Sequence, residues 1–212
     1  MEDLHADLLP IFGAIALLYP GWATVDGGPA RRGPAGLLAL LGGALPLPAQ
    51  ASLVILVRHA EKAIGGDDPG LTMEGWARAE ALVQTLSCVK LDGVITTRYQ
   101  RTRLTAAPVV KAQKLEPVEV AASRDITAHA AEVASLVNAM PAGSAVLIVG
   151  HSNTLAPIIA ALGGPTIPEL CDGQYDGLFF LDWRHRRAAL VRGQYGAADA
   201  PGADGCHAPP AP

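Results

Sequence analysis

Two arginines and two histidines stand where the sequence predicts strands to end. Arg58 and His59 directly follow the apolar run 53–57, and His151 comes just after the apolar run 145–149. Arg101 follows a third predicted strand over 91–96. Taken alone, the Arg58-His59 pair fits the solvent-exposed end of a strand as well as it fits an anion site. Because guanidinium forks suit the equatorial oxygens of a phosphoryl group, their recurrence at three strand ends favours an anion site.

The elements that must position these residues alternate between strand and helix. Strands are predicted over 53–57, 91–96, 117–121 and 145–149, with a closing hairpin over 177–183 and 188–192. One helix is predicted after the cap Thr72, another after the cap Thr127 and a third from Asn153. A further helix is predicted to end near Lys114, and Pro108 within it predicts a kink or a late start. This order favours an α/β domain, a three-layer α/β/α sandwich with a mainly parallel central sheet. The carboxyl ends of parallel strands lie at one edge, where ligands bind.

Composition narrows the function classes. Half of the 212 residues are hydrophobic and the net charge is −4, which argues against a disordered chain and against a dedicated nucleic-acid binder. The three cysteines lie in no CxxC motif, although Cys171 and Cys206 could pair in an oxidising compartment. A zinc ion needs three or four ligands and would be repelled by the neighbouring arginines. We therefore expect no metal and no cofactor.

The two ends of the chain differ from its middle. Residues 1–51 combine Arg31-Arg32, a short apolar stretch over 36–45 and the small-residue terminus Ala49-Gln50-Ala51. This pattern predicts a signal peptide cleaved after Ala51, and hence an exported protein, periplasmic or extracellular, with no stable membrane insertion after leader removal. A loosely packed extension or a membrane-surface hairpin is the alternative. We expect the folded domain over 52–196 and a disordered Ala/Gly/Pro-rich tail over 197–212.

Four motifs resemble the histidine phosphatase superfamily, the phosphoglycerate-mutase-like proteins. They are Val-Arg-His-Ala-Glu-Lys at 57–62, Leu-Thr-Met-Glu-Gly at 71–75, the Thr/Arg-rich run 97–106 and Val-Gly-His-Ser-Asn-Thr at 149–154. The resemblance spans 53–192 and is greatest to small bacterial members with an exported leader; the family's Arg-His-Gly reads Arg-His-Ala here. It implies a phosphoglycerate-mutase-like fold, His59 as nucleophile, Arg58 and Arg101 as phosphate ligands, and His151 as the second catalytic histidine.

The reaction implied by the resemblance is phosphoryl transfer through a phosphohistidine, without a metal. The leaving group needs a proton donor. Asp125 is the predicted donor and Glu61, two residues from His59, is its rival; Asp125 fits a helix-capping or solvent-exposed carboxylate equally well. Without any donor, substrates with good leaving groups such as phosphoramidates become the better candidates. His129 and His185 are expected at the surface.

Three functions remain open at this point. The leading one is a phosphatase acting on a small phosphorylated substrate, with the substrate and the oligomeric state undetermined. The alternative is a phosphate-binding or interaction protein that keeps the pocket without turnover. A mutase is disfavoured because only about thirty residues separate the third predicted strand from His151, which leaves little room for insertions over the site.

Overall fold

The computed structural model describes residues 51, 53–182 and 188–200. Within them, the strands and helices alternate as predicted and end in two further strands. The elements are β1 (Leu53–Arg58), α1 (Met73–Thr85), β2 (Gly93–Thr97), α2 (Gln100–Gln113), β3 (Val118–Val120), α3 (Ile126–Asn138), β4 (Ala145–Gly150), α4 (Ser152–Ala161), β5 (Gly177–Asp182) and β6 (Ala189–Gln194).

The strands form one sheet in the order β3-β2-β4-β1-β5-β6. The pairs β3/β2, β2/β4 and β4/β1 are parallel, whereas β5 and β6 form the predicted antiparallel hairpin against β1. The register places Arg58 opposite Gly150, so the residues that follow β1 and β4 emerge side by side. The expectation of a mainly parallel sheet is therefore confirmed.

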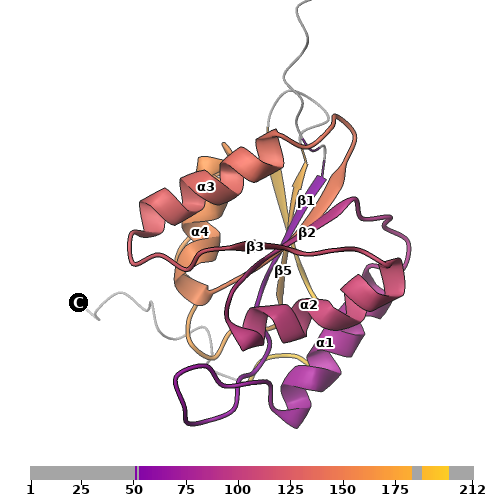
Figure 1. The fold of residues 1–212 in the computed structure, drawn as a ribbon, viewed down its shortest axis with the longest axis vertical. Helices are drawn as coiled ribbons and strands as arrows, with labels where there is room; N and C mark the ends of the chain where they lie inside the picture. The colour runs from indigo at the N-terminus through magenta and orange to yellow at the C-terminus, as the bar shows by residue number, and fades with distance from the viewer. Residues whose placement is uncertain (1–50, 52, 183–187, 201–212) are drawn as a thin grey trace, which may run out of the picture. The chain divides into compact units, whose positions relative to one another are not determined.

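Helices cover both faces of the sheet (Figure 1). On one face α3 and α4 bury apolar side chains such as Val133, Val137 and Ile158 against Leu56 and Ile148. On the other face α1 and α2 bury Leu82 and Val109 against Ile55, Val57 and Leu147. Because neighbouring residues of β1 point to opposite faces, this strand contributes to both cores. The three-layer α/β/α prediction is confirmed.

Two helix starts differ from the sequence prediction. α3 is capped by Asp125, whose carboxylate accepts the Ala128 N–H at 3.0 Å, and not by Thr127, which lies inside the helix. α2 begins at Gln100 and carries Pro108 in its interior, so the predicted late start is wrong. The Thr72 cap of α1 is confirmed by its hydrogen bond from the Gly75 N–H, at 3.1 Å.

The ends of the described domain pack more tightly than expected. Ala51 is fully buried in the core beneath α3 and α4. The tail was predicted to be disordered from Ala197, but residues 197–200 are placed against the domain because the Ala197 carbonyl accepts a hydrogen bond from buried Arg78. Residues 1–50, 183–187 with His185, and 201–212 with Cys206 lie outside the described part, so the predictions for them stay predictions.

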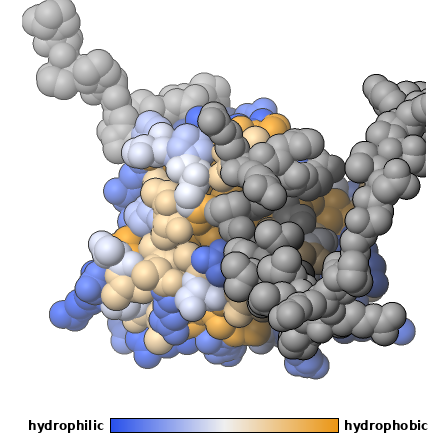
Figure 2. Space-filling view, turned by 90° about the horizontal axis from the view of Figure 1, so that it is seen from above, coloured by the Kyte–Doolittle hydropathy of each residue, from blue (hydrophilic) through white to orange (hydrophobic). Residues whose placement is uncertain are grey.

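No helix in the described residues has the length and apolar character needed to span a membrane. Figure 2 views the domain from the end at which β1 begins, and the coloured part of this face carries both polar and apolar residues. The carboxyl ends of the parallel strands lie at the opposite end of the sheet, where the basic residues gather.

Candidate active site

Side chains from three neighbouring strand ends form the site. His59 follows β1, His151 follows β4, and Arg101 lies in the first turn of α2 after β2. The imidazole rings of His59 and His151 meet edge to face, with their centroids 5.4 Å apart. The Arg101 guanidinium lies 4.1 Å from the centre of the Tyr99 ring, and that ring contacts His151 at 5.6 Å. The predicted convergence of the basic residues is therefore present.

Arg58 is held rigidly from one side. Its Nη1 donates hydrogen bonds to the carbonyls of Cys171, Asp172 and Gln174 at 2.7, 2.9 and 3.0 Å. Its guanidinium also lies 4.2 Å from the centre of the Tyr175 ring. The Nε of Arg58 is buried and has no hydrogen-bond partner within the described residues. A buried donor without a partner is costly, so this atom is a candidate ligand for an anion.

His59 is arranged as a neutral imidazole with one free lone pair. Only 4% of the residue is exposed, and Nδ1 lies 2.8 Å from the Ala60 carbonyl oxygen. A carbonyl only accepts, so Nδ1 carries the proton and Nε2 is unprotonated. Burial lowers the pKa of His59 to about 3; the hydrogen bond to Ala60 opposes the shift, and His151, Arg58 and Arg101 add to it. His59 is thus neutral at ordinary pH.

His151 sits at the N-terminus of α4. Its main-chain N–H donates to Thr154 Oγ1 at 2.9 Å, and its ring atom Nε2 lies 3.2 Å from Thr97 Oγ1 at the end of β2. Burial, together with the smaller effects of Arg101, His129 and Arg58, lowers the pKa of His151 to about 4. The first turn of α4 also directs free N–H groups and the positive end of the helix dipole toward this edge of the sheet.

Arg101 is positioned much as Arg58 is. The ring of Tyr99 stacks on its guanidinium, and Asp68 forms an ion pair with Nη1 at 3.9 Å. Asp68 is itself fixed at the start of α2, because its carboxylate accepts the Gln100 N–H at 2.9 Å. The Nε of Arg101 is buried without a hydrogen-bond partner among the described residues, like that of Arg58. Two unsatisfied guanidinium donors thus belong to one site.

A pocket of about 190 Å³ lies beside His151 and Arg101. Its lining comprises Thr97, Tyr99, Arg101, Ala122, Ser123, Ile126, His129, His151, Asn153 and Thr154. The expected surface position of His129 is wrong: the residue is 3% exposed, because the start of α3 packs against the loop after β3 and Nδ1 lies 3.2 Å from the Ala121 carbonyl. No carboxylate is among these lining residues.

The two candidate proton donors have other partners. Asp125 is exposed and caps α3, as its alternative interpretation proposed; its role as proton donor stays a prediction. The Glu61 carboxylate accepts hydrogen bonds from Arg78 Nε and Nη2 at distances between 2.7 and 3.1 Å. Glu61 is therefore engaged in an ion pair with a buried guanidinium.

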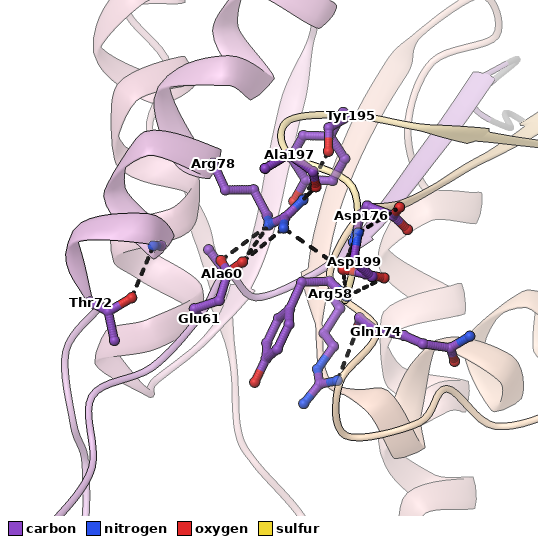
Figure 3. Close-up of polar contacts among 12 residues, drawn as sticks. Arg58, Ala60, Glu61, Thr72, Arg78, Gln174, Asp176, Tyr195, Ala197 and Asp199 are labelled. Atoms are coloured by element: carbon purple, nitrogen blue, oxygen red, sulfur yellow. Dashed lines mark hydrogen bonds and ion pairs between the residues drawn. The ribbon is translucent and has the colours of Figure 1, made fainter. Parts of the chain in front are cut away.

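Sequence reasoning missed the network that supports the site, which is shown in Figure 3. Arg78 from α1 bonds Glu61, and its Nη1 donates to the carbonyls of Tyr195 and Ala197, both at 2.9 Å. Asp199 lies 3.7 Å from Arg78 Nη2 and accepts the Tyr175 N–H at 2.9 Å. The segment after β6 thus connects the loop that follows His59 to the loop that grips Arg58. The only signal in the sequence was a charged residue on the apolar face of α1, next to Ala79.

Known structures share this fold. One is a candidate phosphohistidine phosphatase, SixA from Agrobacterium tumefaciens; it is 23% identical, the match covers 69% of this chain and 99% of that chain, and the TM-score is 0.51. Another is Bacillus stearothermophilus YhfR, which is 20% identical, with 66% of this chain and 96% of that chain covered and a TM-score of 0.53. A third is a phosphoserine phosphatase from Entamoeba histolytica in complex with 3-phosphoglyceric acid. It is 16% identical, the match covers 69% of this chain and 97% of that chain, and the TM-score is 0.51. No curated protein matches the sequence. At these identities the likeness shows the fold alone.

The sequence itself carries a family match over part of this domain. The model of the histidine phosphatase superfamily (branch 1) matches residues 54–132, the segment that contains Arg58, His59 and Arg101. His151 lies beyond the matched segment, and the structure brings it against His59. Over these 79 of the 212 residues the chain is similar to the histidine phosphatase superfamily (branch 1), and its fold is that of the solved structures named above.

Proposed function

We propose that this protein is a phosphatase that hydrolyses phosphate monoesters or phosphoramidates through a phosphohistidine formed on His59. The observation that carries the proposal is the state of His59: a buried neutral imidazole whose Nδ1 proton is bound to Ala60 and whose Nε2 lone pair is free to attack. It lies beside two arginines whose Nε donors lack partners among the described residues. A tetrahedral oxyanion satisfies both donors at once.

The first step is an in-line displacement at phosphorus. The Nε2 of His59 forms a bond to phosphorus while the bond to the leaving oxygen or nitrogen breaks. Arg58, Arg101 and His151 bind the three equatorial oxygens, on which charge is spread in the transition state. Because stacking and backbone hydrogen bonds fix both guanidiniums beforehand, little reorganisation is needed when the substrate binds.

The second step returns the enzyme to its starting state. Water attacks phosphorus, the bond between phosphorus and His59 Nε2 breaks, and inorganic phosphate leaves. The guanidiniums supply the positive charge that both steps need, so the proposed chemistry needs no metal ion. Between β3 and β4 the described chain holds α3 and short connections, which favours hydrolysis by water over the enclosed site of a mutase.

The substrate is proposed only by class. The pocket of about 190 Å³ admits a small leaving group. If the leader prediction for residues 1–51 is correct, the protein is exported to the periplasm or the extracellular space, where it meets phosphate esters outside the cytoplasm. The alternative function, phosphate binding without turnover, is favoured by one observation: none of the residues that line the pocket is an aspartate or a glutamate.

Turnover and trapping test the proposal. We expect the purified full chain to release phosphate from p-nitrophenyl phosphate, and acid-sensitive, alkali-stable label to accumulate on the protein from ³²P-labelled substrate. His59→Ala should abolish both signals, whereas His207→Ala, the loss of a histidine outside the described domain, should leave them unchanged. A wild-type protein that binds vanadate but releases no phosphate would establish the binding alternative. Label that persists in His59→Ala would refute His59 as the nucleophile.

A further inference from the structure

The leaving oxygen of a phosphate ester needs a proton, and the pocket restricts its source. Four of the lining residues carry titratable side chains: Tyr99, Arg101, His129 and His151. A guanidinium does not give up its proton in proteins. The pKa of His151 is lowered to about 4 by burial and by the neighbouring cations, so this imidazole is neutral at ordinary pH and lies against Thr97. His129 and Tyr99 remain.

His129 has the burial and tethering of a proton-transfer group. It is 3% exposed, yet it is an imidazole in the wall of a polar pocket. Its Nδ1 hydrogen bond to the Ala121 carbonyl fixes the ring and assigns a proton to that nitrogen. The second ring nitrogen, Nε2, is then the one that the Ala121 carbonyl does not engage. Tyr99, in contrast, is the stacking partner of Arg101 and contacts His151 with its ring.

His129 lines the same pocket as two of the residues assigned to the phosphoryl group. His151 has neighbours on two sides: its ring lies 5.4 Å from that of His59, and it shares the pocket with His129. His59 itself is not among the residues that line this pocket. Arg101 and His151, which the proposed function assigns to the phosphoryl group, therefore share one pocket wall with His129 at the start of α3. An in-line displacement expels the leaving atom away from the nucleophile.

We propose that His129 is the proton donor to the leaving group, a role that rests on the phosphatase function proposed above. In the first step the bond from phosphorus to His59 Nε2 forms, the ester P–O bond breaks, and the leaving oxygen takes the proton from His129 Nε2. In the second step neutral His129 accepts a proton from water as that water attacks phosphorus. The P–N bond then breaks, phosphate departs, and His129 is again protonated. The residue returns to its starting form in each cycle.

Leaving-group dependence tests this role without relying on overall activity. The variant His129→Gln keeps a polar side chain of similar size but transfers no proton. The comparison uses kcat/KM, which reports the phosphorylation step and not the hydrolysis of the phosphoenzyme that both esters share. For glycerol 2-phosphate, whose alkoxide is a poor leaving group, we expect kcat/KM to fall by roughly 10²- to 10⁴-fold, the usual contribution of general acid catalysis. For p-nitrophenyl phosphate, whose leaving group needs no proton, we expect a decrease of less than about tenfold in the same variant.

Two control variants separate His129 from the other candidates. Asp125→Asn and Tyr99→Phe should show no selective loss on glycerol 2-phosphate. The proposal is overturned if His129→Gln loses the same factor on both esters, as a purely structural residue would, or if the selective loss appears in Asp125→Asn or Tyr99→Phe. Failure of the wild type to turn over either ester would instead refute the phosphomonoesterase function on which this role rests.

A measurement on the wild type alone guards against a variant that does not fold. Across a series of aryl and alkyl phosphates, kcat/KM should depend only weakly on the pKa of the leaving alcohol, because the proton is delivered as the bond breaks. A steep dependence in the wild type would overturn proton donation by any residue, including His129.

Discussion

Replacing Arg78 by methionine should destabilise the domain by about 3–5 kcal/mol, the usual cost of removing one partner from a buried ion pair. Arg78 is 4% exposed, and its guanidinium donates to the Glu61 carboxylate and to two main-chain carbonyls, those of Tyr195 and Ala197. Asp199 lies 3.7 Å away. The variant leaves two carboxylates without their cation and two carbonyls without a donor, while methionine fills only part of the space.

The expected change is measurable by thermal and urea unfolding of the purified protein. For a domain of this size about 1 kcal/mol corresponds to 2–4 °C in Tm, so the predicted decrease is roughly 6–20 °C. The matched control is Arg103→Met, since Arg103 pairs with Glu119 at 3.5 Å but both side chains are more than 40% exposed. An exposed pair contributes about 0–1 kcal/mol, and the control should shift Tm by no more than a few degrees.

A second variant tests the physical reason for the loss. The double variant Arg78→Met/Glu61→Met removes both charges of the closest pair, so it should recover much of the stability lost in Arg78→Met. The reasoning is refuted if Arg78→Met unfolds at the same temperature as Arg103→Met. It is also refuted if the double variant is as unstable as the sum of the two single variants, because the cost would then not arise from an unpaired buried carboxylate.

Three further outcomes follow from the site and the sequence. Because the folded-state pKa values of His59 (about 3) and His151 (about 4) lie below the usual 6.5, the unfolded chain takes up protons first as pH falls below 6.5. The free energy of unfolding should therefore decrease from pH 6.5 downward, by about 2 kcal/mol per imidazole at pH 5, and urea titrations of His59→Gln should show a shallower decrease. Phosphate release should be unaffected by EDTA; loss on chelation with recovery on metal addition would contradict metal independence. Mass spectrometry of exported protein should find Ser52 as the first residue, and retention of residues 1–51 would refute the leader prediction.

The sequence allowed the centre of the site to be predicted because each residue is tied to a local pattern. Arg58 and His59 end one apolar run and His151 follows another; both runs are too short for ordinary helices and predict buried strands, and parallel strands place their carboxyl ends together. Similar local reasoning placed a helix after residue 125 but chose the wrong cap. Asp125 and Thr127 both offer a side-chain oxygen, and the choice depends on how the preceding loop enters the helix.

The surroundings of the site could not be predicted because they depend on contacts between distant parts of the chain. Arg58 is gripped by carbonyls from Cys171 to Gln174, and Arg78 by the segment after β6. Main-chain carbonyls are present at every residue, so no residue type marks them in advance. His129 was expected at the surface because its position near a helix start is usually exposed, whereas here the loop after β3 folds over it.

The position of β1 between β4 and β5 has a consequence for how the protein is made. Leu53 pairs with Ala145 on one side and with Asp182 on the other, so the strand that carries the nucleophile has no neighbour in the sheet until β4 has been synthesised. At 5–20 residues per second, the apolar run 53–57 waits roughly 5–20 s on the ribosome before its first partner appears. Such an unpaired strand is prone to aggregate, so nascent chains of this length should be chaperone clients.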